Sequence, residues 1–219
     1  MKKAALHNLG CKVNAYETEA MQHLLEEAGY EIVPFTQKAD VYVINTCSVT
    51  NMADRKSRQM LHKAKKNNPD SIVVAAGCYV QTSEKEVLND LSVDIVIGND
   101  RKHDLVRLLE EYSLDSVNDT VDDINDGKHD FEELFIDQTK EHTRAFIKVQ
   151  DGCNQFCSYC IIPYARGRVR SRRFENVIAE VERLAANGFK EVVLTGIHLS
   201  SYGVDFEEAT GLLELIQAV

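Results

Sequence analysis

Short apolar runs alternate with longer segments of helical spacing through the first half of the chain. We expect strands at residues 3–8, 30–35, 41–45, 72–76 and 95–97, and helices at residues 14–28, 51–67 and 100–110. The clearest runs are apolar at nearly every position, which is typical of strands buried on both faces. Strands that alternate with helices form parallel sheets covered on both sides. The pattern therefore predicts an α/β fold for residues 1–112, with a doubly wound parallel sheet.

The pattern breaks down between residues 113 and 142, where aspartate, glutamate and asparagine replace most of the large apolar side chains. Such a composition suits an exposed connection between folded units. We interpret residues 113–142 as an acidic linker between two domains. An acidic surface excursion of a single domain is the alternative interpretation.

Strand and helix patterns return after the linker. Residues 144–149 and 191–195 predict strands, residues 176–186 predict an amphipathic helix between them, and residues 212–219 predict the next helix. This arrangement makes one βαβ unit. Two strands cannot form a stable parallel sheet with both faces covered, so residues 143–219 predict a second domain that is incomplete. We infer that the chain is a fragment of a longer protein.

The composition narrows the class of protein. The chain has 219 residues, 44% of them hydrophobic and 27% charged, which is an ordinary globular mixture. No stretch approaches the roughly 18 apolar residues that a membrane helix needs, and residues 1–9 lack the apolar core of a signal peptide. We expect a soluble, cytoplasmic protein with no membrane partner. The net charge of −10 argues mildly against a nucleic-acid partner, and a local basic patch would have to supply one.

Six cysteines in a cytoplasmic chain indicate metal or cluster ligation rather than disulfides. Cys153, Cys157 and Cys160 lie at spacings of four and three, directly after the predicted strand at 144–149. Thiolates suit iron-sulfur clusters and zinc, and three thiolates on a cluster of four irons leave one iron open to a substrate or cofactor. The alternative is a zinc site completed by a histidine or a distant cysteine, although zinc usually takes cysteines paired two apart.

The other cysteines are notable for their position. Cys11, Cys47 and Cys78 each follow the carboxyl end of a different predicted strand. In an open parallel sheet those ends share one edge, where ligands generally bind, so the three thiols can converge there. Three unrelated buried cysteines are the alternative, because free cysteine is among the most buried residue types.

The spacing of Cys153, Cys157 and Cys160 matches the radical S-adenosylmethionine signature. Together with it, four stretches resemble the methylthiotransferases. They are Asn-Leu-Gly-Cys-Lys-Val-Asn at residues 8–14, Val-Ile-Asn-Thr-Cys at residues 43–47, Gly-Cys at residues 77–78, and Pro-Tyr-Ala-Arg-Gly-Arg at residues 163–168. The resemblance covers nearly the whole chain. It implies an amino-terminal domain that holds one 4Fe–4S cluster and a radical partial (β/α) barrel that holds another. We expect the barrel to be cut short in this chain and the family's carboxyl-terminal RNA-binding domain to be absent from it.

Two stretches look most similar to one branch of this family. They are Gly-Cys-Lys-Val-Asn-Ala-Tyr-Glu-Thr-Glu at residues 10–19 and Leu-Thr-Gly-Ile-His at residues 194–198. That branch modifies N6-threonylcarbamoyladenosine at position 37 of tRNA, and the resemblance implies methylthiolation of carbon 2 of the base. By the same resemblance, the cluster on the radical-signature cysteines reductively cleaves S-adenosylmethionine. The cluster on the other three cysteines carries the methylated sulfur.

The resemblance also implies contacts to the cofactor. Tyr159 stands where the family has an aromatic near the adenine of S-adenosylmethionine, and Thr195 and Gly196 stand where the methionine end binds. A packed loop aromatic is the alternative for Tyr159. The implied partners are tRNA, an electron donor and a sulfur source.

A local basic run interrupts the acidic chain. We expect Arg166, Arg168 and Arg170 to hold tRNA phosphates near the radical site. A solvated surface is the alternative.

Two rival functions stay open. One is the same chemistry on another acceptor, either isopentenyl-adenosine in tRNA or an aspartate of a ribosomal protein. The other is a non-catalytic iron-sulfur or zinc protein, which would need a fourth protein ligand for each site. We expect the shortened chain itself to be inactive, because barrel strands and the RNA-binding domain are missing.

Overall fold

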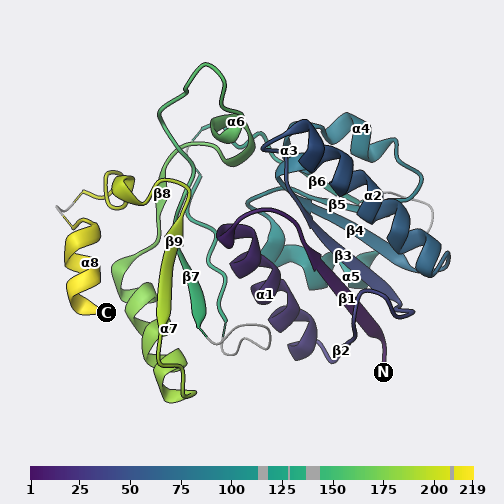
Figure 1. Ribbon diagram of the computed structural model, residues 1–219, viewed down its shortest axis with the longest axis horizontal. Helices are drawn as coiled ribbons and strands as arrows, with labels where there is room; N and C mark the ends of the chain where they lie inside the picture. Colours follow the sequence, from purple (N-terminus) through teal and green to yellow (C-terminus); the bar gives the residue numbers. More distant parts are fainter. Residues whose placement is uncertain (113–117, 128, 137–143, 208–209) are drawn as a thin grey trace.

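The computed structural model describes residues 1–112, 118–127, 129–136, 144–207 and 210–219, and they form two sheets (Figure 1). The larger sheet has six strands and the smaller has three. Helix α1 (Lys12–Glu27) lies between the sheets and packs against both. The expected α/β fold class is confirmed.

The six strands of the larger sheet are all parallel. Their order is β2 (Glu31–Ile32), β1 (Lys3–Asn8), β3 (Val41–Thr46), β4 (Ile72–Gly77), β5 (Ile95–Ile97) and β6 (Asn118–Thr120). Strand β3 is buried at every position, as its unbroken apolar run predicts. Strand β2 is shorter than the predicted strand at residues 30–35. Strand β6 lies inside the segment predicted to be a linker, so that segment is not only an exposed connection.

Helices cover both faces of this sheet. Besides α1 they are α2 (Asn51–Asn67), α3 (Cys78–Thr82), α4 (Glu84–Leu88), the 3-10 turn η1 (Lys102–Asp104) and α5 (Leu105–Glu111). Side chains of α1 and α5 pack in one apolar cluster with one face of the strands, and side chains of α2, α3 and α4 pack in the cluster on the other face. The sheet is therefore doubly wound, as predicted.

The strand order creates a crevice at one point of the sheet edge. After β1 the chain adds β2 on one side, and it then crosses back to add β3 on the other side. The loops that follow β1 and β3 therefore leave in opposite directions. Ligands bind in open α/β sheets outside the carboxyl ends of the strands at such a switch point.

The smaller sheet has the order β8 (Arg170–Ser171), β7 (Ala145–Asp151) and β9 (Val192–Gly196). Its helical elements are α6 (Ile162–Arg166), α7 (Phe174–Ala186), the 3-10 turn η2 (Leu199–Ser201) and α8 (Leu212–Ala218). Strands β7 and β9 are parallel and α7 connects them, which confirms the predicted βαβ unit. Strand β8 pairs antiparallel with β7 and was not predicted, because two residues carry no periodicity.

The two sheets share a buried core through α1. Its residues Tyr16 and Ala20 pack with Ile147 and Val149 of β7 in one apolar cluster. Leu134 joins that cluster from the predicted linker, and Ile124 and Ile136 of the same segment are also buried. Among the described residues, no helix is both long and apolar enough to cross a membrane.

Candidate active site

Three cysteines lie at the carboxyl ends of neighbouring strands of the larger sheet. Cys11 follows β1, Cys47 follows β3 and Cys78 begins α3 directly after β4. The loops approach closely, because a Cβ added to Gly10 would lie 3.0 Å from Sγ of Cys47. Burial raises the pKa of the Cys47 thiol, and the nearby charges of Cys78 and Cys11 raise it further. The structure thus brings these thiols to one edge, next to the switch-point crevice.

Polar side chains surround these thiols. Arg166 donates from Nε to Sγ of Cys78 at 3.3 Å, and Asn99 donates from Nδ2 to the same sulfur at 3.6 Å. The Cys11 thiol donates to Oδ1 of Asn14 at 3.7 Å. Two N–H donors aimed at one sulfur are the kind of hydrogen bonds that orient a thiolate ligand of a metal or cluster.

The other three cysteines lie in the loop after β7. Cys153 and Cys160 are half-buried and Cys157 is exposed. A backbone hydrogen bond fixes the start of this loop: the N–H of Cys153 donates to the carbonyl of Gly167 at 3.0 Å. Gly152 precedes it with φ +70°, and a Cβ there would lie 1.8 Å from the Arg168 carbonyl oxygen. Only glycine fits that close approach, so Gly152 sets where the cysteine loop begins.

A buried ionic network connects the two cysteine sites. Arg166 is fully buried, and its Nη1 donates to Oε1 of Glu17 at 2.6 Å and to Oδ2 of Asp151 at 3.0 Å. Lys148 joins through Nζ, 2.9 Å from Oε1 of Glu17. The same arginine therefore contacts Cys78 at one site and, at the other, the aspartate two residues before Cys153.

The carboxylates of this network are ionised. Burial alone would raise the pKa of Glu17, but Arg166, Lys102 and Lys148 hold it well below its usual range. Burial likewise opposes ionisation of Asp151, yet Arg166 and Lys148 lower its pKa to about 2. Buried charges persist only when they are paired in this way.

The residues expected near S-adenosylmethionine lie in or beside the loop that carries Cys153, Cys157 and Cys160. Tyr159 is 89% exposed, so it is not a packed loop aromatic. Thr195 is buried near the carboxyl end of β9, and Gly196 ends that strand against Gln150 of β7. Their cofactor roles stay predictions.

The three arginines expected to contact tRNA have different environments. Arg166 lies in the interior, where its donors bind Cys78 and acidic and amide side chains, so it has no surface to offer a phosphate. Arg168 is exposed, with its guanidinium carbon 4.3 Å from the ring centroid of Phe156 in the cysteine loop. Arg170 is buried beside a cavity. Only Arg168 keeps the expected exposed position.

Sequence reasoning missed the side chains that support the cysteines. Asn14 and Glu17 stand one helical turn apart on α1 and are both buried. Asn99, after β5, is buried as well. The available signal was a pair of polar residues at helical spacing on a face that otherwise reads as apolar.

The donor sets suit clusters in which each thiolate binds a different iron. Two sets of three cysteines are each carried on loops at the carboxyl ends of strands. Among the described residues, no three histidine, cysteine or acidic side chains lie close enough to bind one metal ion. The ligands of an iron-sulfur cluster bind different irons, so they can lie farther apart than the ligands of a single metal ion. Soft thiolates are the usual ligands of such clusters.

Comparison with family models divides the chain in two. Residues 3–98 match the family described as "Uncharacterized protein family UPF0004". Residues 147–216 match the radical SAM superfamily, whose members bind S-adenosylmethionine at a 4Fe–4S cluster. The second match begins in β7 and includes the loop of Cys153, Cys157 and Cys160.

Several curated relatives are similar over nearly the whole chain. Threonylcarbamoyladenosine tRNA methylthiotransferase MtaB of Bacillus subtilis is 47% identical over 95% of this chain and 46% of the relative. The protein of the same name from Aquifex aeolicus is 45% identical over 98% of this chain and 53% of the relative. A tRNA-2-methylthio-N(6)-dimethylallyladenosine synthase of Thermoanaerobacter sp. is 35% identical over 96% of this chain and 46% of the relative. The chain thus spans about half the length of these relatives.

A solved structure supports the fold. The radical S-adenosylmethionine methyltransferase TsrM from Kitasatospora setae matches with a TM-score of 0.58 and 15% identity, over 91% of this chain and 48% of that one. At this identity the likeness concerns the arrangement of the two sheets alone.

Proposed function

Because this chain belongs to the methylthiotransferase family of radical S-adenosylmethionine enzymes, we propose that it serves tRNA modification. The reaction we propose is methylthiolation of carbon 2 of N6-threonylcarbamoyladenosine at position 37. The base would be recognised in tRNA, and the protein would work in the cytoplasm with an electron donor and a sulfur source. Since the chain spans about half the length of its relatives, the activity is proposed for the intact protein.

One observation carries this proposal. A single buried network links the segments that carry the two sets of three cysteines, because Arg166 contacts Cys78 of one set and Asp151, two residues before Cys153 of the other set. A radical enzyme that needs only S-adenosylmethionine cleavage would need one such set. A second set of three cysteines, linked to the first through this network, suits a reaction that also transfers sulfur.

We assign one cluster to each set. Cys153, Cys157 and Cys160 would hold the 4Fe–4S cluster that binds S-adenosylmethionine, and the second cluster would lie on the set at the switch-point edge, Cys11, Cys47 and Cys78. The clusters and the cofactor together supply the one-electron chemistry that an inert aromatic C–H bond requires.

The protein side chains supply placement. Tyr159 is free on the surface to lie against an adenine ring, and Thr195 and Gly196 end the strand beside the cysteine loop. Arg168, exposed next to Phe156, is the arginine placed to contact an RNA phosphate. The buried network ties the strand end at Asp151 to Glu17 and Cys78, because separating these segments would unpair a buried charge.

The test uses the intact protein, reconstituted with iron and sulfide, and two triple variants. In one variant Cys153, Cys157 and Cys160 become alanine, and in the other Cys11, Cys47 and Cys78 do. Each protein is incubated with S-adenosylmethionine, a reductant, a sulfide source and tRNA that carries N6-threonylcarbamoyladenosine. Mass spectrometry then measures 5′-deoxyadenosine and the methylthio nucleoside.

The wild type should form both products. The first variant should form neither, and the second should still form 5′-deoxyadenosine but no methylthio nucleoside. Formation of the methylthio product by the second variant would overturn the assignment of the switch-point cysteines. Absence of both products from the wild type would overturn the proposed function.

A further inference from the structure

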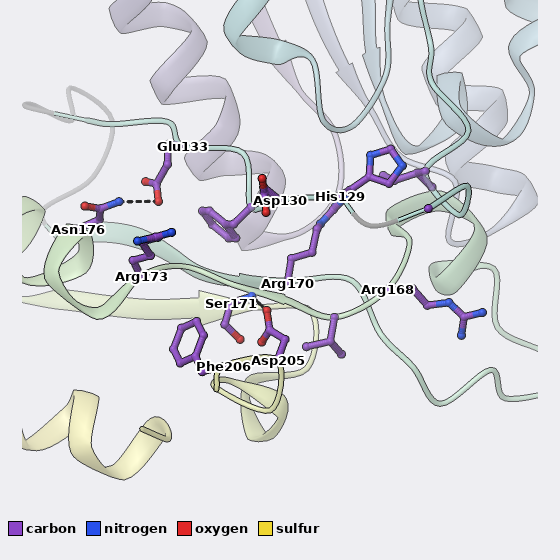
Figure 2. A pocket seen from close by; sticks show the side chains of 14 residues that line it. His129, Asp130, Glu133, Arg168, Arg170, Ser171, Arg173, Asn176, Asp205 and Phe206 are labelled. Atoms are coloured by element: carbon purple, nitrogen blue, oxygen red, sulfur yellow. Dashed lines mark hydrogen bonds between the residues drawn. The ribbon is translucent and has the colours of Figure 1, made fainter. Parts of the chain in front are cut away.

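A cavity of about 470 Å³ lies between β8, the segment around Asp130 and the turn at Asp205 (Figure 2). Figure 2 shows Arg170 extending from β8 towards the segment that carries His129 and Asp130, with Asp205 on the other side. Arg168 lies at one end of the cavity and Arg173 at the other. None of these residues belongs to either cysteine set.

Arg170 is the side chain in this cavity with unused hydrogen-bonding capacity. It is only 5% exposed, and its Nη2 donates to the carbonyl of Arg166 at 3.0 Å. Its Nε and Nη1 have no acceptor among the described residues. A buried guanidinium with two unpaired nitrogens is costly, because each lost hydrogen bond to a charged group leaves a desolvated donor. Nε and Nη1 of Arg170 are therefore two donors for which an acceptor would be favourable.

Two of the acids that line the cavity are already engaged. Glu133 accepts from Arg172 at 2.9 Å and from Asn176 at 2.8 Å. Asp205 accepts from the backbone N–H of Ser171 at 2.8 Å. The third lining acid, Asp130, has no described hydrogen bond to Arg170, and Arg170 makes one described ion pair, 3.9 Å from Nη2 to Oδ2 of Asp151. Nε and Nη1 thus receive no acceptor from these acids, and a ligand that enters the cavity is a candidate source of one.

The cavity adjoins the loop that carries Cys153, Cys157 and Cys160, which we call the radical cysteine loop. The segment that carries Arg170 is tied to that loop, because the N–H of Val169 donates to Oδ1 of Asn154 at 3.1 Å. Arg168 lies over Phe156 of the same loop. A base that reacts at the loop can therefore extend a substituent into the cavity.

We propose that this cavity binds the carboxylate of the threonyl group of N6-threonylcarbamoyladenosine, with Arg170 as the residue that recognises it. The inference rests on the proposed function and deepens it, because it names what distinguishes this acceptor from an adenosine with an apolar substituent. Arginine pairs strongly with carboxylates, and Nε and Nη1 of Arg170 are the donors without an acceptor. Both atoms are enclosed, so the Arg170 side chain has to shift towards the cavity when the carboxylate binds. An isopentenyl group in the same place would offer no acceptor to Nε and Nη1 of Arg170, whose described ion pair to Asp151 runs through Nη2 at 3.9 Å, and this selects against it.

The first test changes the ligand and keeps the protein intact. Anticodon stem-loop RNAs are prepared with position 37 as N6-threonylcarbamoyladenosine, its methyl ester, or isopentenyl-adenosine. The reconstituted intact protein should bind the free acid roughly tenfold to a hundredfold more tightly than the ester. Equal affinities for acid and ester would overturn the inference without bearing on the reaction itself.

The second test changes the protein. Arg170→Gln removes the charge, and it should bind acid and ester with equal affinity. Arg170→Lys keeps a buried cation and should retain part of the preference, which also covers the case that Arg170→Gln does not fold. Arg107→Gln is the control, because Arg107 is exposed on α5 and its described ion pairs are to Asp104 and Glu111. It should discriminate like the wild type.

The outcomes separate the two proposals. If methylthio product forms but Arg170→Gln still prefers the acid, only the role of Arg170 fails. If no product forms from the free-acid RNA, the proposed function fails first. Arg170→Gln should bind S-adenosylmethionine like the wild type. A loss of that affinity, with RNA preference unchanged, would assign Arg170 to the cofactor carboxylate and overturn the inference.

Discussion

Nε of Arg166 lies 3.3 Å from Sγ of Cys78, and both residues are buried. The arginine comes from the segment after the radical cysteine loop, whereas the cysteine comes from the switch-point edge of the larger sheet. A hydrogen bond from a cation to a cluster-ligating sulfur withdraws negative charge from it, which makes the cluster easier to reduce. Arg166 would therefore tune the cluster that we propose for Cys11, Cys47 and Cys78.

Replacing Arg166 should change the redox behaviour of the cluster proposed for Cys11, Cys47 and Cys78. In a background in which the radical-loop cysteines are alanine, Arg166→Gln should shift the ratio of oxidised to reduced cluster about tenfold toward oxidised at a fixed potential. For one electron that is about 59 mV. The measurement is a redox titration followed by electron paramagnetic resonance.

A matched variant separates this effect from general destabilisation. Arg172 is also fully buried and pairs with Glu180 and Glu133, so Arg172→Gln removes a comparable buried charge. Its cluster should titrate at the wild-type potential. A shared shift in both variants would mean that the potential reports loosened packing rather than the Cys78 contact. If Arg166→Gln does not fold, the double variant Glu17→Gln/Arg166→Gln replaces it, because it removes both charges of the buried pair together. The same redox titration is then made on the double variant.

Gly152 should be required for the radical cysteine loop. An alanine Cβ would lie 1.8 Å from the carbonyl oxygen of Arg168, so Gly152→Ala must displace the start of the loop. We expect it to lose the iron bound by that loop and keep the iron at the switch-point edge. Gly188→Ala is the control, because Gly188 also has positive φ but has no atom within 4 Å of the added Cβ among the described residues. It should cost about 1–2 kcal/mol of stability and keep all its iron.

Glu17 should make folding stability sensitive to acid. Its folded-state pKa lies well below the ordinary value of 4.5, so the unfolded chain binds the proton first. The stabilisation is therefore present above about pH 4.5 and is lost as pH falls through the lower folded pKa. Glu17→Gln should destabilise the apo-protein by roughly 3–5 kcal/mol near neutral pH, because it leaves three buried cations short of a partner.

Urea unfolding at neutral and acidic pH checks this expectation. The stability difference between wild type and Glu17→Gln should shrink as the pH falls. A constant difference would show that Glu17 contributes packing and not charge. Glu180 provides a contrast, because burial raises its pKa despite the nearby Arg172, so its protonation should favour the folded state as pH falls.

Tyr159 should contribute to cofactor binding and not to stability. The side chain is 89% exposed, so Tyr159→Ala should change the free energy of unfolding by less than about 0.5 kcal/mol. If its ring lies against the adenine of S-adenosylmethionine, the dissociation constant should rise roughly fivefold or more. Equilibrium binding to the reconstituted protein measures this. An unchanged dissociation constant would remove Tyr159 from the cofactor site.

The elements that sequence reasoning found are those with a repeated apolar pattern. Strand β3 begins with the apolar run Val41–Ile44 and was predictable, because burial on both faces favours apolar side chains at successive positions. Strands β2 and β8 have two residues each, and β6 reads Asn-Asp-Thr. Such short or polar strands are set by backbone pairing to a neighbour that already exists, which no local pattern encodes.

The candidate site also has a part that the sequence predicted and a part that it did not. The sequence singled out the six cysteines as candidate ligands, because a thiol at a strand end has few other uses in this context, and their role as cluster ligands stays a prediction. Their buried partners were missed, because a charged side chain is normally a surface residue. Arg166 stands in a run of arginines that reads as a solvated or RNA-binding face, yet it is fully buried. Only the three-dimensional pairing with Glu17 and Asp151 makes that burial possible.

We propose that the intact protein methylthiolates N6-threonylcarbamoyladenosine in tRNA. The most direct measurement is mass spectrometry of nucleosides from anticodon stem-loop RNAs treated with the reconstituted intact protein, S-adenosylmethionine, a reductant and sulfide. The RNAs carry N6-threonylcarbamoyladenosine, isopentenyl-adenosine or unmodified adenosine at position 37. We predict the 2-methylthio derivative from the first RNA and at most traces from the other two. Efficient product from the isopentenyl RNA, with none from the threonylcarbamoyl RNA, would contradict this account.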